Sequence, residues 1–304
     1  MDIHEACNYV VQKSMHVRTD RENYGAFGEI IDTYRGKLDI GAFGKFKFEG
    51  KKKRMRAKVL LNALNFNFWE KKDGKVLRYE VERKGKKHYG AGALFESIDR
   101  SLGSGFPLLE PYYLARASES DVDKIFRGNI RIPMVDKRAI IMQELGRSGE
   151  QLDSFISRAG SDYWKLVDEL VRTYPSFNDT WKYGEVDVPF YKRAQLLVSS
   201  LHVQGDLKVS GTENGTAFAD YRVPQALREL GIIKYSKQLA SDVDNLVDIK
   251  AGSAAEVEIR AASLVSCNRL AKEYGLKVVE VDNILWMHGR QCKGPHHLTK
   301  TTSY

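Results

Sequence analysis

The sequence predicts a mainly α-helical protein with a small β-hairpin in its N-terminal third. Apolar residues over 163–171 recur at helical spacing, and Pro175 follows shortly after them. Ser253 and Glu256 have the spacing of a capping box, and the helical pattern that begins there ends at Gly275. The clearest strand pattern is confined to residues 76–89. Helices therefore dominate the expected fold.

In the N-terminal third, helical segments are expected on both sides of the hairpin. The first forty residues have a helical pattern that is broken at three glycines, Gly25, Gly28 and Gly36. Residues 76–81 and 88–89 flank a glycine-containing turn at 83–86, which predicts the hairpin. Another helix is expected over 93–100.

The central part is expected to consist of helices joined by loops. Helical spacing predicts five segments, at 122–126, 136–145, 150–156, 163–171 and 191–201. Residues 206–215 are polar and contain glycine, which predicts a loop that leads into Phe218.

Two shorter elements are expected near the C-terminus. Pro224 and Gly231 bracket a short helix over 225–230. The apolar segment 277–286 is ambiguous. Residues 278–281 fit a short strand, after which Asp282 would cap a short helix.

Length and composition fit a globular protein with a substantial core. The chain has 304 residues, a formal net charge of +8, and three cysteines too far apart for a metal motif or a disulfide framework. No apolar run is long enough to span a bilayer, and the N-terminus lacks the segments of a secretory signal. We therefore expect a cytoplasmic protein with reduced thiols and no membrane partner.

Much of the excess of positive over negative charge lies between Lys45 and Arg56. Such a patch can bind phosphates, either of a nucleotide or of a polymer. A solvated loop and helix face is the commoner reason for most lysines of this kind. Phe46 and Phe48 alternate with the charged residues, as in base-stacking surfaces and also in ordinary strands with one buried face.

Most motifs of cofactor and metal enzymes are absent. The sequence contains no glycine-rich phosphate loop, no His-Glu-x-x-His, no Cys-x-x-Cys and no nucleophile-elbow serine. The adjacent His296 and His297 make a poor shared metal site, because neighbouring side chains on a strand point to opposite faces. A zinc enzyme is therefore not expected. The remaining candidates for chemistry are two carboxylates beside aromatic residues, Asp220 and Asp282.

Asp220 is the first of these candidates. It stands between Phe218 and Tyr221, directly before the short helix, where the positive end of the helix dipole would keep its carboxylate ionised. An ionised carboxylate lined by aromatic rings suits the stabilisation of a cationic transition state on a sugar. The alternative, an N-cap aspartate flanked by core aromatic residues, is the commoner situation.

Lys192 and Arg193 are expected near the N-terminus of the helix over 191–201. Backbone donors at a helix N-terminus, together with two cations, would suit a phosphate group. The alternative is that both residues lie on the exposed face of an amphipathic helix.

Several motifs occur together and in order along the chain. They are Asn65-Phe66-Asn67-Phe68-Trp69, Phe190-Tyr191-Lys192-Arg193-Ala194-Gln195, Phe218-Ala219-Asp220-Tyr221-Arg222-Val223-Pro224-Gln225, Tyr235-Ser236, Glu256-Val257-Glu258-Ile259-Arg260 and the segment 282–286. From about Asn65 to the C-terminus, the sequence resembles the queuosine salvage protein family, the queuosine 5′-phosphate N-glycosylase/hydrolases.

The resemblance implies a single domain over residues 1–304, similar to base-excision DNA glycosylases and more divergent over 1–60. It also implies hydrolysis of the N-glycosidic bond of queuosine 5′-phosphate or a related 7-deazaguanine nucleotide, which releases the base and ribose 5-phosphate. No cofactor is implied.

The resemblance assigns roles to individual residues. Asp220 corresponds to the catalytic aspartate, Phe218 lines the base pocket, and Asp282 contacts the base. Lys192 is predicted from its charge and position to contact the 5′-phosphate or the ribose. Further substrate contacts are expected from Asn65, Trp69, Tyr221, Arg222 and Asn283.

Three departures from the family pattern concern base recognition. The family's N-terminal base-binding histidine has no counterpart in residues 43–48. Asn283 stands where tyrosine is common, and Met287 stands where the family has an acidic base contact. Because Asp220 is retained, bond cleavage is expected to be kept, and a simpler deazapurine or an altered queuosine relative becomes a candidate substrate.

Two rival functions remain open. The net charge and the basic run at 51–56 suit a glycosylase that acts on polymeric nucleic acid. A nucleic-acid-binding protein without catalysis is the other candidate. The retained Asp220 disfavours a loss of catalysis, and the lack of a helix-hairpin-helix glycine motif disfavours the polymer glycosylase.

Overall fold

The computed structural model describes residues 2–37, 44–148, 158 and 160–304. The N-terminal elements are α1 (Ile3–Lys13), β1 (Val17–Thr19), α2 (Tyr24–Tyr34), α3 (Lys51–Ala63), β2 (Trp69–Lys72), β3 (Lys75–Arg78), β4 (Glu80–Arg83) and β5 (Lys86–Tyr89). The central elements are α4 (Ala91–Gly103), α5 (Pro111–Leu114), α6 (Glu119–Ile125), α7 (Val135–Arg147), α9 (Tyr163–Thr173), η1 (Pro175–Phe177), β6 (Thr180–Tyr183), β7 (Val186–Pro189) and α10 (Lys192–Val203). The C-terminal elements are η2 (Thr212–Asn214), α11 (Arg222–Glu229), β8 (Ile233–Tyr235), α12 (Lys237–Asp244), α13 (Ala254–Tyr274) and α14 (Val278–Gly289). The predicted mainly α architecture is confirmed.

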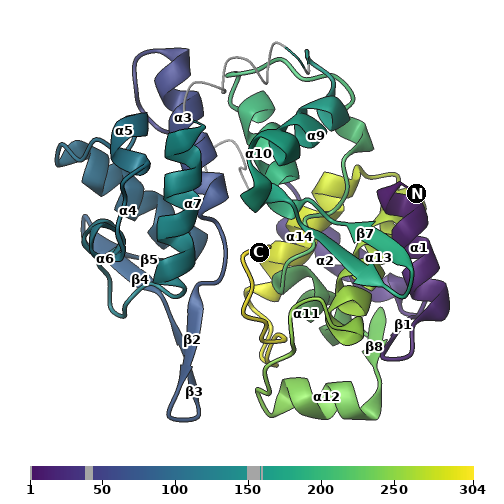
Figure 1. Cartoon of the computed structure of the whole chain (residues 1–304). Helices are drawn as coiled ribbons and strands as arrows, with labels where there is room; N and C mark the ends of the chain where they lie inside the picture. The colour runs from purple at the N-terminus through teal and green to yellow at the C-terminus, as the bar shows by residue number, and fades with distance from the viewer. Residues whose placement is uncertain (1, 38–43, 149–157, 159) are drawn as a thin grey trace.

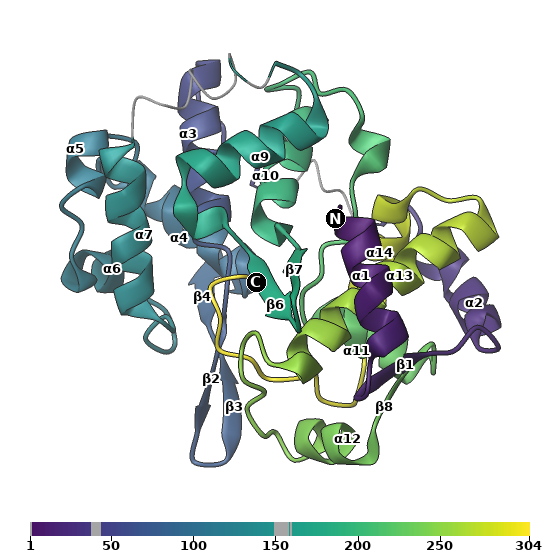
Figure 2. The same cartoon turned by 45° about the vertical axis from the view of Figure 1, so that its right-hand side comes forward.

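The helices form two halves that lie side by side (Figure 1). One half contains α3 to α7 with the hairpins β2–β3 and β4–β5. The other contains α1, α2 and α11 to α14. Helix α10 lies between the halves in both views (Figure 2) and packs against α3. The N-terminus of α10 is therefore placed near the junction.

The buried apolar residues follow the same division. The first core draws all its residues from one continuous stretch, 46–209. The second combines Val17, Tyr24 and Phe27 with residues 217–285, and a smaller third cluster joins α1 to α13. The C-terminal half is thus completed by the N-terminus of the chain. A single domain over 1–304 stays a prediction.

The Glu258 carboxylate on α13 holds the N-terminal segment in place. Its Oε2 atom accepts hydrogen bonds from Ser14 Oγ at 2.6 Å and His16 N at 2.6 Å. Its Oε1 atom accepts one from the Tyr183 hydroxyl at 2.8 Å. The first two bonds join residues 244 and 242 positions apart. A buried carboxylate needs such donors, because an unpaired buried charge is costly.

The strands are short and form four antiparallel pairs within the described residues. The predicted hairpin is confirmed as β4–β5, but residues 76–78 belong to β3, which pairs with β2 in a second hairpin. The pairs β6–β7 and β1–β8 were not predicted. Strands of three or four residues are too short to produce a recognisable alternation, and β1–β8 joins distant parts of the chain.

The segment 278–286 differs from its prediction. It forms one continuous helix, α14, rather than a strand followed by a helix that Asp282 caps. The first turn is closed by Glu280, whose Oε2 atom accepts a hydrogen bond from Lys277 N at 2.9 Å. Val281 and Leu285 lie one turn apart and are both buried, so packing overrides the strand preference of the valines.

Two further predictions need correction. Gly25 and Gly28 lie inside α2 instead of breaking it. A Cβ atom on Gly28 would lie 2.8 Å from the Tyr274 hydroxyl oxygen, so this glycine allows close packing. Ser253 caps α13 as predicted, but Glu256 does not complete the capping box, because its carboxylate accepts hydrogen bonds from Gly252 N and the Tyr304 hydroxyl.

The remaining predicted helices are confirmed with small shifts of their ends, and the helix over 150–156 lies outside the described residues. The loop at 206–215 is confirmed apart from the short η2.

A buried ion pair connects α13 to the start of β6 and to the start of α10, near the junction of the two halves. The Arg260 guanidinium donates to both oxygens of Asp179, at 2.8 and 2.6 Å. Its Nε donates to the carbonyl of Ala219 at 3.2 Å, and its plane lies over Phe190, 3.9 Å from the ring centroid. Asp179 also accepts a hydrogen bond from the backbone N of Lys192 at 3.4 Å. One ion pair thus fixes Ala219 and the start of α10 relative to each other.

We expect Asp179→Ala to lower the free energy of unfolding by about 3–5 kcal/mol, because it removes the carboxylate that binds both terminal nitrogens of Arg260 and leaves the buried guanidinium with the more distant Glu256, 3.7 Å away. The matched control is Asp187→Ala, which removes an exposed ion pair with Lys182 and should cost less than about 1 kcal/mol. Urea unfolding of the two variants measures the difference. Equal costs for both would contradict the importance of the buried pair.

Candidate active site

Asp220 lies at the entrance to α11 and is held by that helix. Its Oδ1 atom accepts hydrogen bonds from the backbone N of Arg222 at 2.7 Å and of Val223 at 3.2 Å. The side chain is 8% exposed. The two backbone donors hold the carboxylate in a fixed position at the start of the helix. The predicted position at the helix N-terminus is confirmed.

Asp282 approaches the same loop from α14. Its Oδ1 atom accepts a hydrogen bond from Phe218 N at 2.8 Å, and its side chain is only 3% exposed. Burial, and next the negative charge of Asp220, raise the pKa of Asp282 well above its ordinary value. The structure therefore brings together the two carboxylates that the sequence singled out, in different electrostatic environments.

Lys192 is the cation of this site. It is the first residue of α10, it is 7% exposed, and its ammonium has no hydrogen bond or ion pair among the described residues. Burial lowers the pKa of Lys192, while the charges of Asp220 and Asp282 act to raise it. The Lys192 ammonium therefore lies in the electrostatic field of two carboxylates and forms an ion pair with neither.

Arg193 does not belong to this site. Its guanidinium is buried and donates to the backbone carbonyls of Ala63 and Ser176. It also lies over the rings of Phe66 and Phe177, 5.4 and 5.2 Å from their centroids. The interpretation of Lys192 and Arg193 as exposed surface residues is wrong for both. Only Lys192 keeps a charge that a phosphate could use.

Aromatic rings line up beside Asp220. The Tyr221 ring stacks on His296 with centroids 4.3 Å apart, and the Arg222 guanidinium lies 5.3 Å from the Tyr221 ring centroid. The Trp69 ring is tilted relative to His296, with centroids 6.5 Å apart. Burial lowers the pKa of His296 to about 3, so this imidazole is neutral at physiological pH. From the sequence, His296 was considered only as a metal ligand, and its stacking on Tyr221 was not predicted.

Asn65 and Asn283 are less clearly placed. Asn65 is buried and Asn283 is half-buried on α14, and neither side-chain amide makes a hydrogen bond in the part of the chain that the structure describes. The structure thus gathers Asp220, Asp282, Lys192, Phe218, Tyr221 and Arg222 around one loop. It does not connect Asn65 or Asn283 to them.

Two carboxylates and an ammonium buried beside aromatic rings are the type of site that glycoside-cleaving enzymes use. The comparisons with known proteins agree. The family model described as queuosine salvage protein matches residues 47–304. The chain belongs to this family. The match begins earlier than the region around Asn65 from which the resemblance was expected.

Three relatives carry the name queuosine 5′-phosphate N-glycosylase/hydrolase. The protein of Sphaerobacter thermophilus is 37% identical over 263 residues, which cover 81% of this chain and 80% of the relative. The protein of Mus musculus is 32% identical over 276 residues, with 81% and 80% covered. The protein of Bos taurus is 30% identical over 273 residues, with 80% and 79% covered.

Among the described residues, every helix is too short or too polar to pass through a lipid bilayer.

The raised pKa of Asp282 gives a pH-dependent prediction. Folding favours the protonated carboxyl, so its stabilising effect is lost as pH rises through the raised pKa. Asp282→Asn keeps an oxygen for Phe218 N and cannot ionise. Its free energy of unfolding should therefore fall less between about pH 5 and about pH 9 than that of the unmodified protein. Urea titrations across this range provide the measurement.

The matched control for that prediction is Asp187→Asn, which changes an exposed carboxylate and should leave the pH dependence unaltered. If Asp282→Asn followed the same pH dependence as the unmodified protein, the burial of this carboxyl would carry no cost.

Proposed function

We propose that this protein hydrolyses the N-glycosidic bond of queuosine 5′-phosphate or a related 7-deazaguanine nucleotide and releases the free base and ribose 5-phosphate. Membership of the queuosine salvage protein family and the names of the relatives support this proposal. The structural observation that carries it is the Asp220 carboxylate, held by two backbone donors beside a second carboxylate and a buried ammonium.

Asp220 has the properties that the cleavage requires. As the bond between C1′ and the base nitrogen breaks, positive charge develops on C1′ and the ring oxygen of the sugar. We assign to the Asp220 carboxylate the stabilisation of this charge. The bonding electrons leave with the base, which takes up a proton, and water supplies the hydroxyl of ribose 5-phosphate. The backbone donors of α11 fix the carboxylate before the reaction, so little reorganisation is needed.

Asp282 and the aromatic residues are assigned to the base. The amino and imino groups of a guanine-like edge can donate to a carboxylate, and such donors favour the ionised form of Asp282 when the base is bound. Phe218 and Tyr221 offer ring faces for stacking. Asn283 and Met287 replace polar contacts that the family pattern leads one to expect, so the preferred base is a 7-deazaguanine whose side chain makes fewer polar contacts there.

Lys192 is assigned to the 5′-phosphate. A buried ammonium without an ion-pair partner is unfavourable in the free protein, and a dianionic phosphate would compensate its charge. The assignment also explains why the substrate is a nucleotide rather than a nucleoside.

The proposal has further parts that concern the whole chain. It takes residues 1–304 as one domain related in fold to base-excision DNA glycosylases, and it places the protein in the cytoplasm. A mononucleotide is the proposed substrate rather than a polymer. Lys51 and Lys53, at the start of α3, are exposed and can contact anions of any kind. They therefore do not favour a polymer over a mononucleotide.

We expect Asp220→Asn to reduce kcat by at least about 10²–10³-fold, because the amide keeps an oxygen for the two backbone donors and removes the charge. Release of base from queuosine 5′-phosphate, followed by chromatography, is the measurement. The control is Asp162→Asn, since Asp162 also accepts a backbone hydrogen bond at a helix N-terminus, from Lys165 N at 2.9 Å. Full activity of Asp220→Asn, or equal losses in both variants, would contradict the assigned role.

We expect Lys192→Met to raise KM for the 5′-phosphorylated substrate by about 10–100-fold and to change turnover of the nucleoside little, because only the former uses the ammonium. The same variant should unfold at a higher temperature, since the cost of burying the ammonium outweighs its attraction to Asp220 and Asp282. Lys237→Met, at an exposed position, serves as the control. Equal losses for the nucleotide and the nucleoside would show that Lys192 does not contact the phosphate.

A further inference from the structure

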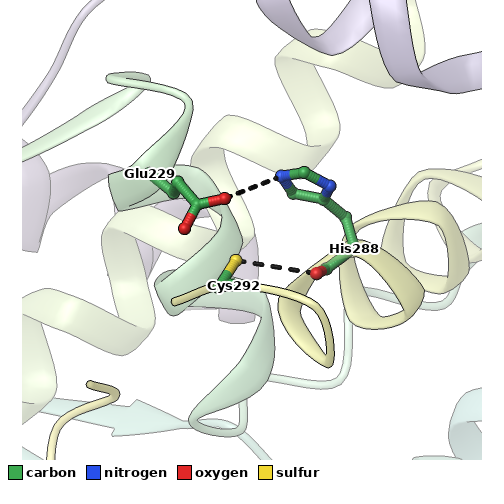
Figure 3. A group of neighbouring side chains, drawn as sticks. All are labelled: Glu229, His288 and Cys292. Atoms are coloured by element: carbon green, nitrogen blue, oxygen red, sulfur yellow. Dashed lines mark hydrogen bonds and ion pairs between the residues drawn. The ribbon is translucent and has the colours of Figure 1, made fainter. Parts of the chain in front are cut away.

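Three potential metal ligands meet where α11 and α14 end, apart from the residues assigned to catalysis. Glu229 is the last residue of α11, His288 lies in the last turn of α14, and Cys292 follows four residues later (Figure 3). The ligand atoms of the three side chains all lie within 4.8 Å of one another. This combination of carboxylate, imidazole and thiol comes from two helices and the turn after them.

The spacing of the carboxylate and the imidazole suits a shared ion. Glu229 Oε1 lies 3.4 Å from His288 Nε2. Two ligand atoms at about 2.0–2.1 Å from a tetrahedral Zn²⁺ are about 3.4 Å apart. The two atoms are therefore already at the separation that a bound ion would require.

The His288 imidazole is the second, independent observation. Both of its ring nitrogens are buried and neither has a hydrogen-bond partner in the described chain. The contact of Nε2 with Glu229 Oε1 at 3.4 Å does not have hydrogen-bond geometry, and buried polar atoms are normally paired, so this imidazole can take a further ligand. The His288 ring packs against Tyr34 in a T-shaped arrangement with centroids 5.7 Å apart, and this contact limits the rotation of the imidazole.

The other two side chains are held in place by backbone groups. Glu229 Oε2 accepts a hydrogen bond from Lys293 N at 3.3 Å, which orients the carboxylate and leaves Oε1 available. The Cys292 thiol donates to the carbonyl of His288 at 3.6 Å, so the sulfur stays beside the imidazole (Figure 3).

We propose that Glu229 Oε1, His288 Nε2 and Cys292 Sγ bind one Zn²⁺ ion, with a water molecule in the fourth position. On binding, the Cys292 thiol gives its proton to solvent and the thiolate sulfur donates an electron pair to the ion. The neutral imidazole, with its proton on Nδ1, donates the lone pair of Nε2.

The charges and the ligand types favour zinc over the hard divalent cations. A carboxylate and a thiolate together balance the charge of a divalent ion, and thiolate and imidazole suit Zn²⁺ better than Mg²⁺ or Ca²⁺.

The bound ion would join the two helices that carry the proposed catalytic groups. Helix α11 supplies the backbone donors to Asp220, and α14 carries Asp282. The Arg222 guanidinium already donates to the carbonyl of Gly289 at 3.3 Å across the same contact. The ion would therefore have a structural role, since it lies at the ends of the two helices and its ligands do not include Asp220 or Asp282.

The test titrates the metal-stripped full-length protein with Zn²⁺ by isothermal calorimetry and measures bound zinc by elemental mass spectrometry. We expect one zinc per chain and no comparable binding of Mg²⁺. Cys292→Ser and His288→Gln should each weaken zinc binding at least about tenfold, because each removes one of three ligands. The control is His88→Gln, which alters a histidine 4.0 Å from the Glu96 carboxylate with no cysteine in the group.

Thermal unfolding provides a readout that does not depend on turnover. Zinc should raise the unfolding temperature of the unmodified protein and of His88→Gln, and should have little effect on Cys292→Ser and His288→Gln. Failure of the unmodified protein to bind one zinc would overturn the proposal. Zinc binding that is unchanged in both ligand variants would do the same, whether or not the protein cleaves nucleotides.

Discussion

The buried pair between Arg260 and Asp179 determines the geometry of the proposed site. It is the point at which three distant parts of the chain meet: α13, the segment before β6, and the loop that ends at Asp220. Arg260 binds the carbonyl of Ala219, and Asp179 binds the backbone N of Lys192. Asp220, the proposed catalytic carboxylate, and the buried ammonium of Lys192 are therefore positioned by the same two charges. A shift of this pair would move both ends of the substrate site together.

The electrostatics of the site follow from how differently its charged groups are compensated. Asp220 receives two backbone hydrogen bonds at a helix N-terminus, whereas Asp282 receives one and is more deeply buried. The Lys192 ammonium donates none within the described chain. An arrangement of this kind is costly in the free protein, and the proposed transition state, with positive charge on the sugar and an anionic phosphate, would compensate it. Stability is thus reduced where binding and catalysis need charge.

The sequence predicted the helices well where a local signal was present. Proline, glycine and the capping serine marked α11 and α13, and the position of Asp220 at the start of α11 followed from them. It failed where tertiary packing decides, as in α14, where buried contacts outweigh the strand preference of Val278 and Val279. The β1–β8 pair and the stacking of His296 on Tyr221 join residues far apart, and no periodic pattern in the sequence records such contacts.

The candidate site was predictable in part for the same reason. The motifs around Asp220 and Asp282 gave both carboxylates, but the burial of Lys192 could not be read from its place at a polar helix start. Lys192 and Arg193 have different surroundings because two adjacent side chains point in different directions from α10. Charge alone does not distinguish the two residues. The group of Glu229, His288 and Cys292 has no recognisable spacing, because one of its members lies on another helix.

The hydrogen bonds between Glu258 and the N-terminal segment have a consequence for the order of folding. The core of residues 46–209 can assemble from a continuous stretch as soon as that stretch has left the ribosome. Residues 14–17 must wait for their partner more than two hundred positions later, so the C-terminal half closes late in synthesis. The half that carries both carboxylates is therefore the last to mature, and residues 14–17 stay without their Glu258 partner until α13 has been made.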